Sequence, residues 1–199
     1  RLRSGLAFVA SGIDVSASGL AFRCDENLPP DAHCEVHFSL PFANGNTHSF
    51  TLHAVTAVDA EALGAAFAAI APWSVYPYSA AALGSYLKSA TPAAPRYLAR
   101  CNGTAAGALG LQTDWLRGPY IQFLGILPEF QSHRLGTRLL QWIEADARAK
   151  AQRNLWVAAS QFNDRARRFY IDFGFVEAAE IPDLVADGVT EILLRKRLG

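Results

Sequence analysis

Methionine is absent from this chain of 199 residues, and cysteine occurs only three times, at Cys24, Cys34 and Cys101. An odd and low number of cysteines is typical of proteins in a reducing compartment, where disulfides do not persist. The sequence therefore predicts a cytoplasmic protein. Because the chain starts at Arg1 without a methionine, we expect it to be a processed chain or one that lacks some residues of the parent protein.

Long apolar runs and net charge are also missing. No stretch of roughly 18 or more apolar residues occurs, so we expect no transmembrane helix, and no secretory cleavage pattern follows the first residues. The 18 lysines and arginines balance the 18 aspartates and glutamates. No overall field therefore attracts nucleic acid or an anionic membrane, and neither is an expected partner.

A metal site is not expected either. The one group with suitable side chains is Cys24, His33, Cys34 and His37. Cys24 and Cys34 lack the C-x2-4-C spacing that zinc sites usually show, so the H-x3-H spacing of His33 and His37 has no matching cysteine pair. We interpret these residues as parts of strands or loops.

The pattern of residues changes near position 58. Residues 1–58 are rich in short apolar runs broken by turn formers, which favours an antiparallel β segment. Residues 59–199 alternate between helical and strand patterns, which favours a mixed α/β domain. The expected helices cover residues 59–70, with Asp59 as N-cap, and residues 79–88, 137–152 and 163–173. The expected strands cover residues 6–9, 19–22, 34–40, 49–58, 97–101, 107–111, 120–126, 154–159 and 191–194.

A strand, a short loop and a long helix follow one another from Phe123 to Leu140. The unpaired amides at a helix start, together with the helix dipole, suit an anion such as a pyrophosphate. Gly136 would let the backbone approach phosphate closely, and Arg134 and Arg138 add positive charge nearby. An ordinary strand-to-helix connection is the alternative explanation of this loop.

The next segment carries a more specific pattern. Residues 154–160 read as a strand, and N-x-x-A-x-x-F-Y-x-x-x-G-F follows from Asn163 to Phe175. This resembles the second signature of the GNAT acetyltransferases. Gln131 and Gly136 match the family's first signature, in which Gln or Arg is followed by x-x-G-x-G or x-x-G-x-A, but Arg134 stands where the family usually has its first glycine. This departure bears on the geometry of the loop and on cofactor affinity.

The resemblance covers roughly residues 59–199. It implies a mixed central sheet with flanking helices, in which two neighbouring parallel strands splay apart and admit the acetyl-pantetheine arm of acetyl-CoA. It implies that Tyr170 protonates the departing thiolate, although Tyr170 could instead only pack its helix on the sheet. Asn163 is equally consistent with an N-cap and a cofactor contact. The expected cofactor-binding residues are Leu124, Gly125, Ile126, Gln131, Ser132, His133, Arg134, Leu135, Gly136, Thr137 and Asn163.

The acceptor and the general base are less well marked. The acceptor could be a polyamine, an antibiotic, an amino acid or a protein N-terminus, and Trp and Tyr side chains in residues 71–78 could contact it or only cover the core. Asp114, Glu129 and Glu191 are the carboxylates considered as a base, beside a water relay that would leave no signature.

Residues 1–58 carry a second, shorter resemblance. Residues 14–19 match the D-x-S-x-x-G signature of PilZ domains, which bind cyclic di-GMP. That family's Arg-x-x-x-Arg element is replaced by Arg1-Leu2-Arg3, so we expect no binding of cyclic di-GMP. The alternative is a small β unit that packs on the transferase or forms a homodimer contact.

Two functions follow from these patterns. The first is an N-acetyltransferase that moves an acetyl group directly from acetyl-CoA to a primary amine of a small molecule or peptide. The second is a non-catalytic module that senses acyl-CoA beside a PilZ-like unit. The presence of Tyr170 favours the enzyme, whereas Arg134 in place of glycine weakly favours the module.

Overall fold

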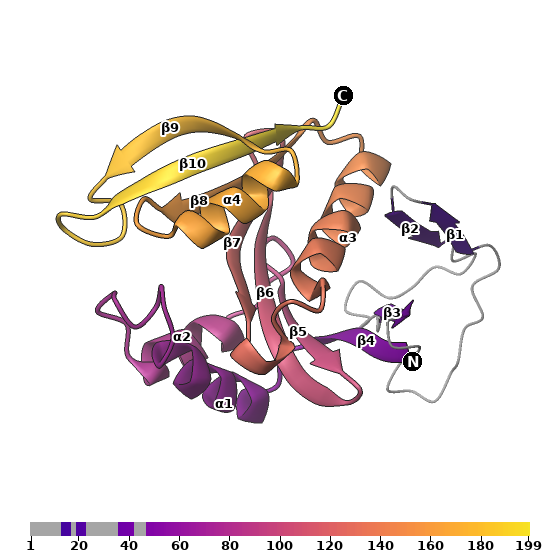
Figure 1. Ribbon diagram of the computed structural model, residues 1–199, viewed down its shortest axis with the longest axis horizontal. Helices are drawn as coiled ribbons and strands as arrows, with labels where there is room; N and C mark the ends of the chain where they lie inside the picture. Colours follow the sequence, from indigo (N-terminus) through magenta and orange to yellow (C-terminus); the bar gives the residue numbers. More distant parts are fainter. Residues whose placement is uncertain (1–12, 17–18, 23–35, 42–46) are drawn as a thin grey trace.

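A computed structural model of the protein describes residues 13–16, 19–22, 36–41 and 47–199, with side chains described from residue 51 onward. An eight-stranded sheet forms its centre, in the order β3-β4-β5-β6-β7-β8-β10-β9 (Figure 1). A separate two-stranded hairpin comprises β1 (Ile13–Ser16) and β2 (Gly19–Phe22). The expected strand at residues 6–9 lies outside what the structure describes, as do Cys24, His33 and Cys34, whereas His37 lies in strand β3 (Val36–Pro41).

The strands of the central sheet are antiparallel except for one pair. They are β3 (Val36–Pro41), β4 (Thr47–Ala54), β5 (Arg96–Cys101), β6 (Thr104–Trp115), β7 (Gly118–Ile126), β8 (Asn154–Ser160), β9 (Val176–Pro182) and β10 (Thr190–Arg197). The parallel pair is β7 and β8, whose register covers only Tyr120 opposite Trp156 and Ile121 opposite Val157. Beyond these positions the two strands diverge, which confirms the expected splayed pair and the GNAT-type mixed sheet.

Four α-helices cover the two faces of the sheet. Helices α1 (Ala57–Ala68) and α2 (Ala80–Lys88) pack on one face through Phe67 and Leu87, against Phe123 and other sheet residues. Helices α3 (Leu135–Ala149) and α4 (Asp164–Asp172) pack on the other face, where Leu140 and Tyr170 belong to the largest core cluster. The short helix η1 (Pro128–Phe130) joins β7 to α3.

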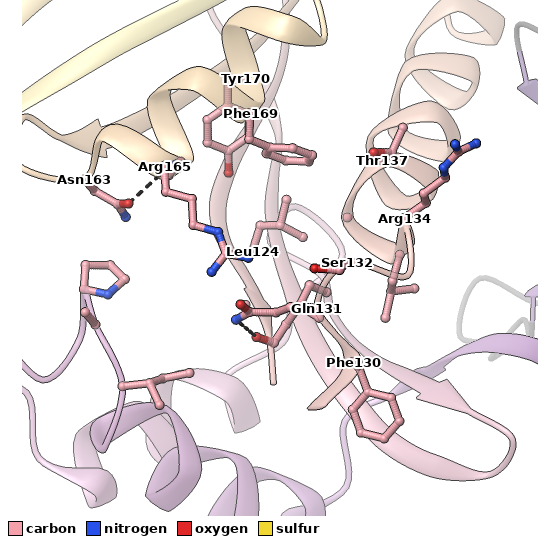
Figure 2. Close-up of a pocket in the computed structure, with 18 of the residues that line it drawn as sticks. Leu124, Phe130, Gln131, Ser132, Arg134, Thr137, Asn163, Arg165, Phe169 and Tyr170 are labelled. Carbon is pink, nitrogen blue, oxygen red and sulfur yellow. Dashed lines mark hydrogen bonds between the residues drawn. The ribbon is translucent and has the colours of Figure 1, made fainter. Parts of the chain in front are cut away.

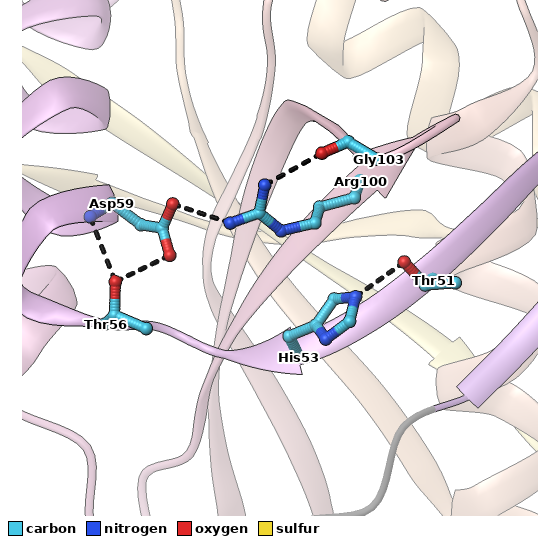
Figure 3. A network of polar contacts seen from close by, with 6 residues as sticks. All are labelled: Thr51, His53, Thr56, Asp59, Arg100 and Gly103. Carbon is cyan, nitrogen blue, oxygen red and sulfur yellow. Dashed lines mark hydrogen bonds and ion pairs between the residues drawn. The ribbon is translucent and has the colours of Figure 1, made fainter. Parts of the chain in front are cut away.

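The first turn of α1 is tied to the sheet by polar contacts (Figure 3). Thr56 is the N-cap, because its Oγ1 accepts a hydrogen bond from the amide of Asp59. The expectation that Asp59 itself caps the helix was therefore wrong. The Asp59 carboxylate instead pairs with Arg100 of β5 at 2.8 Å, and Arg100 also donates to the carbonyl of Gly103. These contacts fix the start of α1 beside the β5–β6 hairpin.

Several other expectations differ from the structure. The strand expected at residues 49–58 ends at Ala54, because α1 already begins at Ala57, and β1 was not expected. Helix α3 begins at Leu135, two residues before the expected start, so the loop preceding it is shorter. Strand β9 was not expected at all. It is an edge strand, and all but one of its seven residues are exposed, so its sequence lacks the alternation of a half-buried strand.

The N-terminal strands bear on the expected division at residue 58. Strands β3 and β4 extend the central sheet, since β4 pairs with β5 from Phe50 opposite Cys101 to Ala54 opposite Tyr97. Strands from both sides of residue 58 therefore belong to one sheet. A PilZ-like unit over residues 1–58 stays a prediction, and Arg1 and Arg3 lie outside the described residues.

Candidate active site

The larger of two adjacent cavities, of about 400 Å³, opens where β7 leaves β8. We call it the first cavity; it extends from the starts of α3 and α4 to the segment that follows α1 (Figure 2). Its lining residues are Ile70, Ala71, Pro72, Trp73, Leu124, Gly125, Ile126, Phe130, Gln131, Ser132, Arg134, Leu135, Gly136, Thr137, Asn163, Arg165, Ala166, Phe169 and Tyr170.

The start of α3 supplies free amides to this cavity. The first hydrogen bond of the helix runs from the amide of Arg138 to the carbonyl of Arg134, at 3.0 Å. The amides of Leu135, Gly136 and Thr137 therefore have no acceptor within the helix, and all three residues line the cavity. With the positive end of the helix dipole, they form a site suited to an anion.

The loop before α3 uses left-handed backbone at two residues that are not glycine. Arg134, the residue before the helix, has a φ of 58°, and Ser132 has a φ of 67°. This is the conformation in which glycine is preferred, because an L side chain costs roughly 1–2 kcal/mol there. Arg134 thus adopts the left-handed backbone conformation that glycine prefers, and its side chain lines the cavity.

Gln131 connects this loop to the end of β7. Its side-chain Nε2 donates to the carbonyl of Ile126 at 2.9 Å, a bond drawn in Figure 2. The amide group of Gln131 is therefore engaged within the protein, although the residue lines the cavity. Its structural effect is to fix η1 and the start of α3 relative to the open end of β7.

Gly125 allows close packing behind the cavity. A Cβ atom at this position would lie 2.5 Å from the ring of Phe67 and 2.8 Å from that of Trp73. Trp73 stacks on Phe123, with ring centroids 4.6 Å apart, and lines the cavity. A glycine in β7 thus lets an aromatic wall from the α1–α2 connection lie directly against the backbone of the strand.

Tyr170 lies at the inner end of the first cavity, on α4. Its side chain is 6% exposed and packs on Phe169 and Phe175 at 5.2 and 5.6 Å between ring centroids. In Figure 2 its hydroxyl points toward the cavity. Burial and, to a smaller degree, the neighbouring Tyr120 raise the pKa of Tyr170 well above its usual range, so the phenol keeps its proton at neutral pH.

The start of α4 contributes two further residues. Asn163 is the N-cap, because its Oδ1 accepts from the amide of Ala166 at 3.1 Å, and it also lines the cavity. Of the two roles that the sequence suggested for Asn163, the structure therefore shows the N-cap. Arg165 was missed: Figure 2 shows it reaching from α4 into the cavity, and it stands at a variable position of the signature, where the sequence gives no signal.

A second cavity, of about 180 Å³, adjoins the first. The two cavities share Pro72, Trp73, Leu124, Asn163, Ala166 and Tyr170. The second cavity continues between β7, β8 and β10 and is further lined by Tyr76, Tyr78, Tyr120, Ile121, Gln122, Phe123, Val157, Ala158, Ala159, Ser160, Leu184, Val185 and Glu191. A molecule in the first cavity therefore meets a molecule in the second beside Tyr170.

Not every residue singled out in the sequence lies at these cavities. All expected cofactor-binding residues line the first cavity except His133, which is half-buried in the loop. Arg138, Glu129 and Asp114 line neither cavity and are exposed. Of the carboxylates considered as a base, only Glu191 reaches a cavity, where it is 5% exposed.

Comparison with known proteins is consistent with this geometry. The model of the acetyltransferase (GNAT) family matches residues 60–175. An uncharacterized N-acetyltransferase of the pepI 3′ region from Lactobacillus delbrueckii subsp. lactis is 28% identical over 117 residues, which cover 55% of this chain and 68% of that protein.

Solved structures share the fold at lower identity. The ribosomal-protein-S18-alanine N-acetyltransferase from Escherichia coli has a TM-score of 0.59 and 19% identity, covering 75% of this chain and 94% of that chain. Ard1 from Thermoplasma volcanium has a TM-score of 0.61 and 16% identity, covering 75% of this chain and 98% of that chain.

Proposed function

Because this chain belongs to the acetyltransferase (GNAT) family, we propose that its two cavities hold acetyl-CoA and an amine acceptor, with Tyr170 between them. The protein is an N-acetyltransferase, and acetyl-CoA is its co-substrate. The observation that carries the proposed site is the convergence of a splayed strand, an open helix start and a buried tyrosine on one cavity.

The pyrophosphate of acetyl-CoA would bind at the start of α3. The amides of Leu135, Gly136 and Thr137 have no helical acceptor, so they can donate to phosphate oxygens. Arg134 and Arg165 line the same cavity and supply positive charge to a ligand that carries several negative charges.

The pantetheine arm would lie along the end of β7 that β8 leaves open. Register with β8 ends after Ile121, so the later residues of β7 have free backbone groups on that side. An amide-containing arm can add to such an edge as an extra strand does. Gln131 already occupies the carbonyl of Ile126, so the arm would pair with β7 ahead of that carbonyl.

The reaction then takes place where the cavities meet. The neutral amine attacks the thioester carbon, a C–N bond forms, and the carbonyl oxygen gains negative charge that backbone amides near residues 124–126 stabilise. When the tetrahedral intermediate collapses, the C–S bond breaks and coenzyme A leaves as a thiolate. Tyr170 donates its proton to this thiolate. The attacking nitrogen loses a proton in the same step, which restores the phenol.

The raised pKa of Tyr170 refines this role. A thiol has a pKa of about 8.5, below the ordinary tyrosine value of about 10 and further below the raised pKa of Tyr170, so complete transfer from the phenol to the thiolate is unfavourable by itself. Tyr170 would therefore share its proton while the C–S bond breaks and recover it from the nitrogen, rather than remain ionised.

Among the described residues no helix is long and apolar enough to cross a bilayer. A cytoplasmic location is supported by the low cysteine count, and a homodimer stays a prediction. The sensing module is the less favoured alternative, because the family match is to an acetyltransferase.

Binding of acetyl-CoA tests the proposed site. Acetyl-CoA at about 100 times its dissociation constant should stabilise the protein by roughly 2.7 kcal/mol, which a melting scan would register. Coenzyme A should act similarly, because the proposed anion site binds the part that both molecules share. A melting temperature unaffected by saturating concentrations of both ligands would reject the assignment of the first cavity.

A further inference from the structure

The second cavity is chemically unlike the first, because its lining contains a single charged side chain. That side chain is Glu191 of β10; the other lining residues are neutral, and they are aromatic, aliphatic or small apart from the amides Gln122 and Asn163. Its volume of about 180 Å³ is less than half of the first cavity's 400 Å³. The cavity thus admits a compact group, and the charge of that group is decided by Glu191.

Glu191 is buried, and among the described residues it has no cationic partner. Its Oε1 accepts a hydrogen bond from the hydroxyl of Tyr76, which also contacts the hydroxyl of Ser160. No lysine, arginine or histidine of the described residues forms an ion pair with Glu191. A buried carboxylate without a cation is unfavourable, so a ligand that brings a positive charge to Glu191 would be stabilised there.

Three phenols surround this carboxylate and remain neutral. Burial, first, and the charge of Glu191, second, raise the pKa of Tyr78 and of Tyr120. Burial and the hydrogen bond to Glu191 raise the pKa of Tyr76 to about 12. These neutral phenols leave Glu191 as the one charge of the cavity lining, which favours a ligand group of opposite charge.

The outer part of the second cavity is apolar. Leu184 and Val185, from the β9–β10 connection, line it with 51% and 36% of their surfaces exposed. Tyr78 lines it as well, and Phe162 lies beside Tyr76 with ring centroids 5.9 Å apart. An apolar substituent next to the ammonium would cover these side chains, and the burial of apolar surface would stabilise the complex.

The lining also disfavours two kinds of amine. No basic side chain lines the second cavity, so the carboxylate of a free amino acid would face Glu191 unpaired. No second acid lines it either, so a polyamine would leave its other charges without a partner. The charge of the site matches one ammonium group.

We propose that the acceptor is a monocationic primary amine with a compact apolar substituent and no carboxylate beside the amine, held by Glu191. This inference rests on the proposed function and names its acceptor. Glu191 takes one proton from the ammonium, which leaves the neutral amine to attack acetyl-CoA beside Tyr170, and releases that proton to solvent after the reaction.

A panel of acceptors tests the inference in the full chain. Benzylamine and isopentylamine represent free monoamines, and a tetrapeptide amide that begins with phenylalanine represents a peptide N-terminus with the same local chemistry. Spermidine and free phenylalanine are the matched amines with extra positive or negative charge. We expect kcat/KM for a monoamine or the peptide to exceed that for both charged controls by about tenfold or more. A faster reaction with the monoamines indicates a small-molecule acceptor, and a faster reaction with the peptide indicates a peptide N-terminus.

Substitution of Glu191 provides the second test. Glu191→Gln keeps an oxygen that can accept from Tyr76, so folding should be retained. Calorimetry on the coenzyme A complex should show benzylamine binding weakened by about 30-fold or more, as expected when one partner of a buried charge pair is removed. Neutral benzyl alcohol should bind both forms alike. Glu180→Gln, on the exposed strand β9, is the control and should change neither value.

Different results would overturn the inference about the acceptor and the proposed function. A protein that binds acetyl-CoA but prefers spermidine or phenylalanine, or acetylates neither the monoamines nor the peptide, overturns the inference alone. Equal binding of benzylamine to the parent and to Glu191→Gln also overturns it. Failure to bind acetyl-CoA would instead remove the proposed function on which the inference rests.

Discussion

The two cavities are built in different ways. The first takes its polar groups largely from backbone in continuous segments: the end of β7, the loop after it and the start of α3. The second is formed by side chains from the α1–α2 connection, β7, β8, α4, β10 and the β9–β10 connection. Backbone sites need particular turns and glycines, which leave spacing patterns in a sequence, whereas converging side chains from distant segments leave none.

Tyr170 belongs to both cavities, so its substitution gives the largest expected effect. Tyr170→Phe removes the proton donor and keeps the ring in its contacts with Phe169 and Phe175. We expect kcat to fall by roughly 100-fold or more, with acetyl-CoA affinity and stability little changed. Steady-state kinetics and calorimetry would measure this.

A matched control is available for the loss of a buried hydroxyl. Tyr86 has a buried hydroxyl without a hydrogen-bond partner and lines neither cavity, so Tyr86→Phe should leave kcat near the parent value. If Tyr170→Phe acetylates at the parent rate, Tyr170 is a packing residue, and proton delivery belongs to water or another group.

Gln131 tests the first cavity alone. Gln131→Ala removes the hydrogen bond that fixes the loop to the carbonyl of Ile126, and one such bond contributes about 0.5–1.5 kcal/mol. We expect the affinity for coenzyme A to fall by up to about tenfold, while acceptor preference stays the same. Titration calorimetry with coenzyme A would measure the first and competition between acceptors the second.

Gln152 offers the same kind of bond away from both cavities. Its Nε2 donates to the carbonyl of Thr113, also at 2.9 Å, so Gln152→Ala should reduce stability without weakening coenzyme A binding. An equal loss of coenzyme A affinity in both variants would mean that Gln131 acts through general stability and has no special role in the first cavity.

Arg134 gives the smallest expected effect. Arg134→Gly removes a side chain from left-handed backbone and should raise the free energy of unfolding by up to about 1 kcal/mol. Loss of the charge should weaken coenzyme A binding about threefold, and less so at high salt because salt screens charges. Denaturant titrations and binding at two salt concentrations would measure these changes.

Ser132 separates the backbone effect from the charge effect. It has a φ of 67° in the same loop and is uncharged, so Ser132→Gly should also stabilise the protein without weakening coenzyme A binding. If both variants weaken binding alike, the flexibility of the loop, and not the charge of Arg134, controls the affinity.

The success of the sequence-based predictions follows the same division. Most strands of the sheet, the four helices and the splayed pair were foreseen, because hydrophobic periodicity and the two signatures span these elements. Most expected cofactor-binding residues line the first cavity, since they are consecutive in the loop; only His133 does not. Arg165 could not be foreseen, because nothing but its position on α4 directs it into the cavity.

The second cavity and the place of Glu191 in it could not be predicted from the sequence. Glu191 was one of three carboxylates considered, and no spacing distinguished it from Asp114 or Glu129. Its place beside Tyr76 arises from contacts between residues more than 100 positions apart. The unexpected edge strand β9 pairs with β10, which carries Glu191, and the connection between them supplies the apolar outer part of the cavity.

Hydrogen exchange with and without coenzyme A tests the central claim most directly, because it reports where the ligand lies along the backbone. The proposed site predicts slower exchange in residues 124–126 and 135–137 when coenzyme A is present, and no change in the edge strand β9. Unchanged exchange in both of those segments at saturating coenzyme A, or protection confined to other parts of the chain, would contradict the assignment of the first cavity.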